Sequence, residues 1–453
     1  MLRVAVVGSG PSGCYTAQGL VQQDPEVLVD VLDRLPCPYG LVRYGVAPDH
    51  EKIKSLQNNL RTVLEHERVR FLGGVHIGPD GVPAARLREL YHAVVYCVGA
   101  ATDRHLGIPG EDLPGSWSAT EFVSWYSAHP DSAADGFVVG ARSAVVIGVG
   151  NVAVDVTRML ARGLAELNPT DMPQGALAAL AASQVTEIHM VGRRGPSQAR
   201  FTTKELRELG GLPGTQVTVD PQELALDPGY EDPSGLPATQ RRNVEVLRGW
   251  ANAPAQEAAS RRIRLRFFLR PVELLAERGR VGAVRFERTV PDGQGGVTGS
   301  GRFEEIEAQL VLRSVGYRGV PLKGLPFDSR NGTVPHLAGR VLRQGVVAPG
   351  EYVAGWIKRG PTGVIGTNRP CAKETVASLL EDAPALVHKD LPEDPLEALR
   401  ADGIQPVEWA GWQAIERAEA QLGASLGRSV VKLPDWESLL TAARSMAPER
   451  RGP

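Results

Sequence analysis

The chain has 453 residues, which is long enough for two or three domains with a large core. Apolar residues make up 42% and charged residues 23% of it, as in ordinary globular proteins. The formal net charge of −2 predicts no general attraction to nucleic acid or to an anionic membrane. No run of 18 apolar residues occurs, so we expect no membrane span.

The four cysteines are Cys14, Cys37, Cys97 and Cys371. None forms a C-x-x-C pair, and none has the spacing of a zinc or iron–sulfur site. Cys14 and Cys97 lie in apolar segments, where a buried and inert thiol is expected. Any electron that the protein handles must therefore reside on a bound cofactor.

A glycine fingerprint follows the first predicted strand, residues 2–7. It is formed by Gly8, Ser9, Gly10, Pro11, Ser12 and Gly13, and a helix is expected from about Ser12 to Gln22. Glycines at this place allow a tight turn and a close approach of the backbone to a pyrophosphate, which binds at the helix N-terminus. The alternative is a glycine turn that binds no ligand.

A second strand is predicted over residues 27–33 and ends at Asp33, which stands 20 residues after Gly13. A carboxylate at this distance binds the hydroxyls of an unphosphorylated ribose, as in FAD or NAD. Asp30 is an alternative, but it lies on the other face of the strand. A helix over 51–66 and a strand over 93–98 complete this part of the chain.

A second fingerprint follows the strand predicted over 143–147. Its residues are Gly148, Val149, Gly150, Asn151, Val152 and Ala153. The next strand, 185–191, leads to Arg193 and Arg194 with no acidic residue there. Two guanidinium groups suit a phosphate dianion, and the 2′-phosphate of NADP is the natural candidate. A solvated arginine pair is the alternative, and Asn151 could simply cap the helix.

The remaining segments are less regular. Residues 211–240 are rich in Pro, Gly and Asp and are interpreted as surface excursions, whereas 261–269 alternates charged and apolar residues as a strand does. A hairpin tip is predicted at 291–296. A short strand over 352–356 leads through a Gly-rich turn at 360–368 into a helix, and we expect this junction to pack on the first nucleotide-binding domain.

Four ordered runs resemble the adrenodoxin reductase-like ferredoxin–NADP+ reductases. They are residues 41–50, 150–156, 191–196 and 355–368. The resemblance implies an α/β protein with two Rossmann-like, three-layer nucleotide-binding domains. The FAD-binding domain would be discontinuous, with residues 1–103 and 323–453, and an NADP-binding domain of residues 104–322 would be inserted in it.

The resemblance also implies the residues of each site. The expected FAD-binding residues are Gly8, Gly10, Ser12, Gly13, Asp33, Leu41, Ile77, Trp356, Gly363, Val364 and Ile365. The expected NADP-binding residues are Arg104, Gly148, Gly150, Asn151, Val152, Ala153, Val154, Arg193, Arg194 and Glu205, together with Gly363. Related chains usually have Glu where this chain has Asp33. Glu205 is interpreted as a partner of a ribose hydroxyl or of an adjacent arginine, and Trp356 either stacks on a cofactor ring or packs in the core.

His50 stands just before the helix predicted over 51–66. It is either a helix-end or core histidine or, as the resemblance implies, one member of a catalytic pair with Glu208 near the nicotinamide. Such a pair could orient the ring or manage a proton.

Eight arginines gather within residues 241–270. They are Arg241, Arg242, Arg248, Arg261, Arg262, Arg264, Arg266 and Arg270. A basic patch that includes Arg241, Arg242, Arg261 and Arg262 would steer an acidic ferredoxin, although a solvated face of an arginine-rich protein is the alternative. Nucleic acid is not expected as a partner.

The sequence thus predicts an FAD-containing ferredoxin–NADP+ reductase, which could also feed electrons to a cytochrome P450 system. A disulfide reductase would need a cysteine pair that this chain lacks. An electron-input subunit of a larger complex and a non-enzymatic NADP sensor remain alternatives. Because the first strand begins at Leu2 and leaves no room for a targeting peptide, we expect a bacterial cytoplasmic protein, or an organelle-matrix protein whose presequence has been removed.

Overall fold

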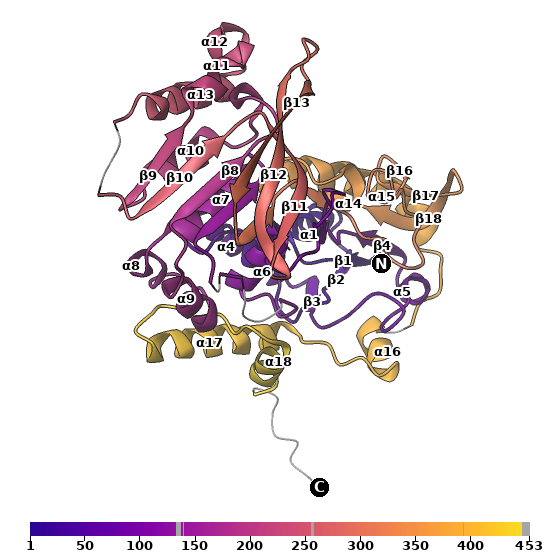
Figure 1. Cartoon of the computed structure of the whole chain (residues 1–453). Coiled ribbons are helices and arrows are strands. Elements are labelled where there is room, and N and C mark those ends of the chain that lie inside the picture. The colour runs from indigo at the N-terminus through magenta and orange to yellow at the C-terminus, as the bar shows by residue number, and fades with distance from the viewer. Residues whose placement is uncertain (133–136, 139, 255–257, 393, 446–453) are drawn as a thin grey trace. The chain divides into compact units, whose positions relative to one another are not determined.

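A computed structural model describes residues 1–132, 137–138, 140–254, 258–392 and 394–445 (Figure 1). The chain forms two compact units. The first comprises Met1–Thr102, Ser127–Asp131 and Gly316–Pro453, and the second comprises Asp103–Tyr126 and Ser132–Val315. Among the described residues, no helix is long and apolar enough to cross a membrane. The compartment remains a prediction.

The first unit is built on a seven-stranded sheet with the order β16-β17-β18-β4-β1-β2-β3. The strands from β18 to β3 run parallel, and β16, β17 and β18 are antiparallel. The strands are β1 (Arg3–Val7), β2 (Leu28–Leu32), β3 (Val69–Leu72), β4 (Ala93–Tyr96), β16 (His336–Leu337), β17 (Arg340–Arg343) and β18 (Val346–Val353). Strand β18 lies beside β4 although some 250 residues separate them, so the far end of the chain completes the first sheet.

The first unit also contains a set of α-helices, part of which packs against this sheet. They are α1 (Pro11–Gln23), α2 (Leu41–Tyr44), α3 (Glu51–Lys54), α4 (Leu56–Leu64), α5 (Ala84–Leu90), α14 (Trp356–Arg359), α15 (Asn368–Leu386), α16 (Pro395–Ala401), α17 (Trp409–Ser425) and α18 (Trp436–Arg444). The expected helix 51–66 is interrupted at Ser55, whose hydroxyl donates to the carbonyl of Lys52 (2.8 Å). A serine side chain that binds the backbone in this way competes with regular helix bonding.

The second unit contains a parallel six-stranded sheet with the order β6-β14-β7-β8-β10-β9. Its strands are β6 (Ser116–Ser118), β7 (Ser143–Ile147), β8 (Glu187–Val191), β9 (Thr215–Val219), β10 (Arg261–Arg266) and β14 (Leu310–Arg313). A separate antiparallel sheet consists of β11 (Leu269–Glu277), β12 (Arg280–Pro291) and β13 (Val297–Glu307). The turn between β12 and β13 confirms the predicted hairpin tip.

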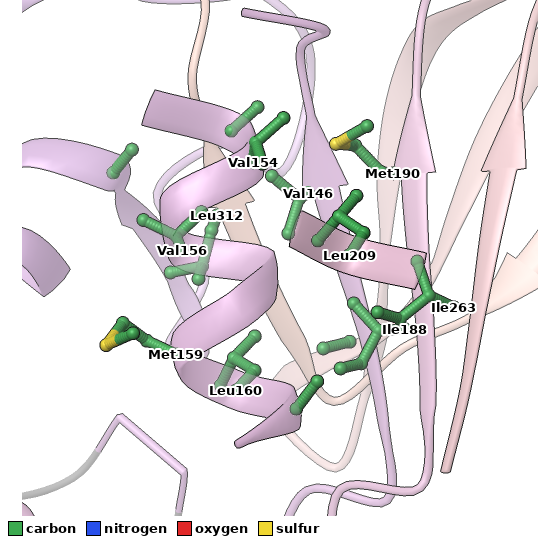
Figure 2. Close-up of a cluster of buried hydrophobic side chains, with 14 of the residues drawn as sticks. Val146, Val154, Val156, Met159, Leu160, Ile188, Met190, Leu209, Ile263 and Leu312 are labelled. Carbon is green, nitrogen blue, oxygen red and sulfur yellow. The ribbon is translucent and has the colours of Figure 1, made fainter. Parts of the chain in front are cut away.

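Apolar side chains join the helices of the second unit to its parallel sheet. The helices are α6 (Ala119–Tyr126), α7 (Asn151–Ala161), α8 (Leu164–Leu167), α9 (Gln174–Ala181), α10 (Thr203–Gly210), α11 (Pro221–Ala225), α12 (Pro228–Glu231) and α13 (Ala238–Ala251). Figure 2 shows Val154 and Leu160 of α7 in one cluster with Val146, Ile188 and Ile263 of the sheet. The two units therefore share the strand–turn–helix arrangement of parallel α/β sheets.

The interpretation of residues 211–240 as surface excursions is wrong for residues 215–219, whereas residues 228–240 include no buried residue. Residues 215–219 form the edge strand β9, where Val217 and Val219 are buried. The Asp and Pro residues that suggested an irregular surface instead begin short helices. Asp220 and Asp227 each accept a backbone hydrogen bond as the N-cap, and a proline follows each as the first helical residue. The predicted strand over 261–269 is confirmed for Arg261–Arg266 in β10, where Ile263 and Leu265 are buried, whereas Leu269 begins β11 in another sheet.

Candidate functional site

The first fingerprint forms a turn between β1 and α1 that admits no side chain at two positions. Gly8 has a φ of +110°, and a Cβ there would lie 2.5 Å from the carbonyl oxygen of Cys97. A Cβ at Gly13 would lie 1.8 Å from the carbonyl oxygen of Gly8. By contrast, a Cβ at Gly10 would meet only the Cα of Gly40, at 3.8 Å. Gly10 is the N-cap of α1, and no side chain of the described residues caps this helix, so its first N–H groups suit an anion.

Asp33 lies at the end of β2 and is bonded to this turn. Its carboxylate accepts hydrogen bonds from the backbone N–H and the hydroxyl of Ser9, and from the N–H of Leu35 (2.9 Å). Burial raises the pKa of Asp33, and the hydrogen bonds from Ser9 and Leu35 oppose that rise. Asp30 points elsewhere, because it pairs with Arg70 (2.8 Å) and accepts from the hydroxyl of Tyr91 (2.8 Å). Of the two carboxylates, only Asp33 is bonded to the fingerprint.

The segment after β18 packs against the start of α1. A Cβ at Gly355 (φ +78°) would lie 2.4 Å from the hydroxyl oxygen of Ser12. The half-buried ring of Trp356 contacts Tyr317, with centroids 5.3 Å apart, and its buried indole N–H has no hydrogen-bond partner among the described residues. Further along, Gly363 has a φ of +82° and Val364 is 64% exposed. A half-buried indole ring and an exposed apolar side chain are features that a bound aromatic ring could cover.

The other two expected FAD-binding residues of the first unit differ in exposure. Leu41 begins α2 and is 39% exposed. Ile77 is only 4% exposed and packs in an apolar cluster, so its side chain is core and only its backbone could face a ligand.

The second fingerprint repeats the geometry of the first between β7 and α7. Gly148 has a φ of +140°, and a Cβ there would lie 2.1 Å from the carbonyl oxygen of Ser314. A Cβ at Gly150 would meet no atom within 4 Å. Gly150 is the N-cap of α7 and, as in α1, no side chain in the described part of the chain caps the helix. The side chain of Asn151 instead accepts a hydrogen bond from the N–H of Thr202 (2.8 Å), so the alternative that Asn151 caps α7 is wrong.

The residues that follow in α7 face the interior. Ala153 and Val154 are fully buried, and Val152 is half-buried. These three residues can contact a ligand only through the backbone at the start of the helix or, for Val152, through part of its side chain.

Three arginines lie near the C-terminal end of β8. Arg193 is exposed, and the pKa of Arg194 is lowered by partial burial and then by the charges of Arg193 and Arg200. In the described part of the chain, no carboxylate pairs with any of the three. The N–H of Arg200 donates to the carbonyl of Val149 (2.8 Å), which ties this residue to the fingerprint. Sequence reasoning missed Arg200, because only the folded loop brings it to the turn.

Glu205 and Glu208 lie on α10 beside a buried arginine of α7. The guanidinium of Arg158, which is fully buried, lies 3.7 Å from Glu205 and 3.4 Å from Glu208, and it also pairs with Asp155 (2.8 Å). Arg158 is thus the adjacent arginine that the sequence left unnamed. His50 is the N-cap residue of α3 in the first unit and is 7% exposed. Since His50 and Glu208 belong to different units, their pairing remains a prediction.

Four of the eight arginines within 241–270 pair with carboxylates of the described residues. Arg262 and Arg264 pair with Glu187, Arg266 pairs with Glu223 and Glu304, and Arg270 pairs with Glu287. Arg248 and Arg261 donate to backbone carbonyls. Arg241 and Arg242 on α13 are exposed, as is Arg104 near the start of the second unit. The net positive charge of this region is therefore smaller than the sequence indicates.

The four cysteines are free and buried. Burial raises the pKa of the thiols of Cys14, Cys37 and Cys97, to about 11 for Cys37 and to about 12 for Cys97. These three thiols are protonated near neutral pH and are poor nucleophiles. The expectation that Cys14 and Cys97 are buried is confirmed.

Two glycines of the second fingerprint should respond differently to substitution. We expect Gly148→Ala to lower the free energy of unfolding by more than about 2 kcal/mol, because its Cβ collides with a backbone carbonyl. Gly150→Ala should cost less than about 1 kcal/mol, because the added Cβ meets open space. Chemical denaturation of both variants beside the unchanged protein measures the difference, and equal losses would contradict this account of the turn.

Comparisons with known proteins agree with this geometry. Residues 2–210 match the family model described as pyridine nucleotide-disulphide oxidoreductase. The chain is 45% identical over 457 residues to NADPH-ferredoxin reductase FprA of Mycobacterium tuberculosis, covering 96% of this chain and 98% of that one. It is 40% identical to the mitochondrial NADPH:adrenodoxin oxidoreductase of Arabidopsis thaliana, covering 98% and 95% of the two chains.

A solved structure of Mycobacterium tuberculosis FprA in complex with NADPH superposes with a TM-score of 0.92 at 42% identity, covering 98% of this chain and 99% of that one. The resemblance found in the sequence and the expected α/β fold are thereby confirmed. The chain belongs to the adrenodoxin reductase-like family of ferredoxin–NADP+ reductases.

Proposed function

We propose that this protein is an FAD-dependent ferredoxin–NADP+ reductase, which passes electrons between NADPH and a ferredoxin-type iron–sulfur protein. The observation that carries the proposal is the pair of fingerprint turns, which differ in the charge of the side chains beside them. The chain that contains them is similar over almost its whole length to enzymes of this activity. Bound FAD would exchange a hydride with NADP(H) and single electrons with the iron–sulfur protein. The residues of the chain position the two nucleotides and exclude water from them.

FAD is assigned to the first unit. The uncapped start of α1 would bind its pyrophosphate, Gly10 would let the phosphate approach the backbone, and Asp33 would accept from a ribose hydroxyl. The carboxylate of Asp33 already accepts three hydrogen bonds, which leaves about one of its four lone-pair positions for that hydroxyl. Trp356 and the loop from Gly363 to Ile365 would lie against the flavin ring.

NADP is assigned to the second unit. The uncapped start of α7 would bind its pyrophosphate beside Gly150, and the arginines after β8 would bind the 2′-phosphate. Because Arg193, Arg194 and Arg200 have no carboxylate partner among the described residues, their charge is available to an anion. Arg104 would add a further cation. Glu205 is assigned to holding Arg158 rather than to a phosphate.

The visible spectrum of the purified protein tests the function. We expect flavin absorption bands that NADPH bleaches under anaerobic conditions, followed by reduction of an added ferredoxin. A nucleotide-sensing protein would show no flavin bands, and an electron-input subunit would be bleached but would fail to reduce ferredoxin by itself. Either result would contradict the proposal.

The arginine cluster should determine the preference for NADPH over NADH. Arg193→Ala or Arg194→Ala should raise the KM for NADPH by about 10- to 100-fold and change that for NADH by less than about twofold, because only NADPH carries the 2′-phosphate. Arg200→Ala should have the same sign and a smaller size. Arg142→Ala, at the opposite end of β7, is the control and should alter neither KM. Equal losses for both nucleotides would remove the cluster from the phosphate site.

His50 and Glu208 are assigned to the nicotinamide region, where they would orient the ring or hold a proton. Hydride transfer requires no general base, so His50→Gln and Glu208→Gln should lower kcat by no more than about tenfold and leave the FAD content unchanged. Steady-state kinetics with NADPH and ferricyanide measures this effect. A loss of a thousandfold or more would instead assign them to proton transfer in the chemical step.

The partner is assigned by charge. We infer that the exposed Arg241 and Arg242 on α13 contribute to the attraction of an acidic ferredoxin, whereas Arg261 donates to a backbone carbonyl and Arg262 pairs with Glu187. The double variant Arg241→Glu/Arg242→Glu should lower kcat/KM for ferredoxin by about tenfold or more at low salt, with little change at high salt. Arg278→Glu/Arg302→Glu is a charge-matched control, and ferricyanide reduction should not change. A uniform effect of both double variants would contradict docking at α13.

A further inference from the structure

The C-terminal part of the first unit carries no motif in the sequence, yet it buries several polar groups. Glu419 of α17 and Lys432, which follows that helix, are each 2% exposed, and Trp412 of α17 is 1% exposed. Helix α17 lies near the yellow end of the chain in Figure 1. Buried charged side chains require partners. The partners of these residues show which part of the first unit the C-terminal segment contacts.

The partner of Glu419 is Arg43 of α2. The guanidinium donates to both carboxylate oxygens, at 2.6 and 3.1 Å, and the side chains are 5% and 3% exposed. The N–H of Leu433 donates to the same carboxylate (3.0 Å). A bidentate pair of this kind fixes the orientation of both side chains, and the loss of one partner leaves a buried charge uncompensated.

Two further C-terminal side chains contact the same short stretch. The Trp412 ring lies edge-on to Tyr39, with centroids 5.8 Å apart, and its centre lies 5.0 Å from the guanidinium carbon of Arg43. The ammonium of Lys432 donates to the carbonyl of Arg43 (2.6 Å). The C-terminal segment therefore fixes both ends of the stretch from Tyr39 to Arg43.

This stretch in turn lies on the first fingerprint. The N–H of Tyr39 donates to the carbonyl of Ser9 (3.1 Å), and a Cβ at Gly40 would lie 2.9 Å from the Cα of Gly10. Tyr39 has a φ of +82°, a left-handed conformation that a tyrosine adopts only where its surroundings impose it. The Trp412 ring of α17 and the hydrogen bond to Ser9 are contacts that hold this residue in place.

We propose that residues 409–433 are a positioning element for FAD, in which Glu419, Trp412 and Lys432 hold the turn at Tyr39 and Gly40 against Gly10 and so set how tightly FAD is retained. If the turn is already ordered before FAD binds, none of the binding free energy is needed to order it. The inference rests on the proposed function, which assigns FAD to this fingerprint.

The test is the retention of FAD by the purified holoenzyme. Glu419→Gln should raise the Kd of FAD by about tenfold or more, because binding would then have to impose the strained conformation of Tyr39. The Kd is measured from the fluorescence of released flavin. The affinity for NADP+, which depends on the second unit, should stay within about twofold. Glu397→Gln is the matched control, because Glu397 of α16 lies outside residues 409–433 and pairs with Arg400 (2.6 Å) at exposed positions.

A second variant separates positioning from stability. Arg43→Met/Glu419→Met removes both buried charges, a replacement that proteins often tolerate without loss of stability. It should unfold near the temperature of the unchanged protein and still release FAD faster. Retention of FAD at the unchanged level by both Glu419→Gln and the double variant would overturn the inference. An unchanged protein that contains no flavin would contradict the proposed function instead.

Discussion

Each unit depends on a glycine turn in which a backbone carbonyl fills the space that a side chain on the glycine would need. At Gly8 the carbonyl comes from Cys97, after β4, and at Gly148 it comes from Ser314, after β14. Strand β4 pairs with β1, which precedes the first turn, and β14 pairs with β7, which precedes the second turn. The close approach brings the start of a helix to the end of the sheet, with N–H groups that no side chain caps. The binding chemistry of both units follows from this constraint.

The two turns differ in the charge of the side chains beside them. The first is bonded to Asp33, whose carboxylate holds Ser9 and disfavours an additional phosphate. The second is bonded through Val149 to Arg200, within a cluster of three arginines. In the proposed assignment, an acidic and a basic neighbour beside the same backbone geometry would give two sites with opposite preferences for the ribose 2′ position. With Cys14, Cys37 and Cys97 protonated and all four thiols unpaired, electrons would pass through the bound nucleotides.

Features that depend on neighbours in the sequence could be predicted, and those that depend on distant contacts could not. The fingerprints, their strands and the position of Asp33 at the end of the second strand follow from local spacing. Arg200, Arg158 and the Arg43–Glu419 pair were missed, because only folding brings their partners together. The Asp-Pro pairs from Asp220 onwards were misinterpreted, since the same residues that mark irregular loops also begin helices. The arginines near β10 were overestimated as a patch, because their carboxylate partners come from other strands and helices.

The central claim is that the two units bind two different nucleotides, distinguished by the groups beside two similar turns. A crystal structure of the protein grown with FAD and NADP+ tests it most directly. The account predicts the FAD pyrophosphate at the start of α1 and the NADP+ pyrophosphate at the start of α7, with the 2′-phosphate within hydrogen-bond distance of Arg193 or Arg194. A 2′-phosphate that lies beside Asp33, or two nucleotides that share one turn, would contradict it.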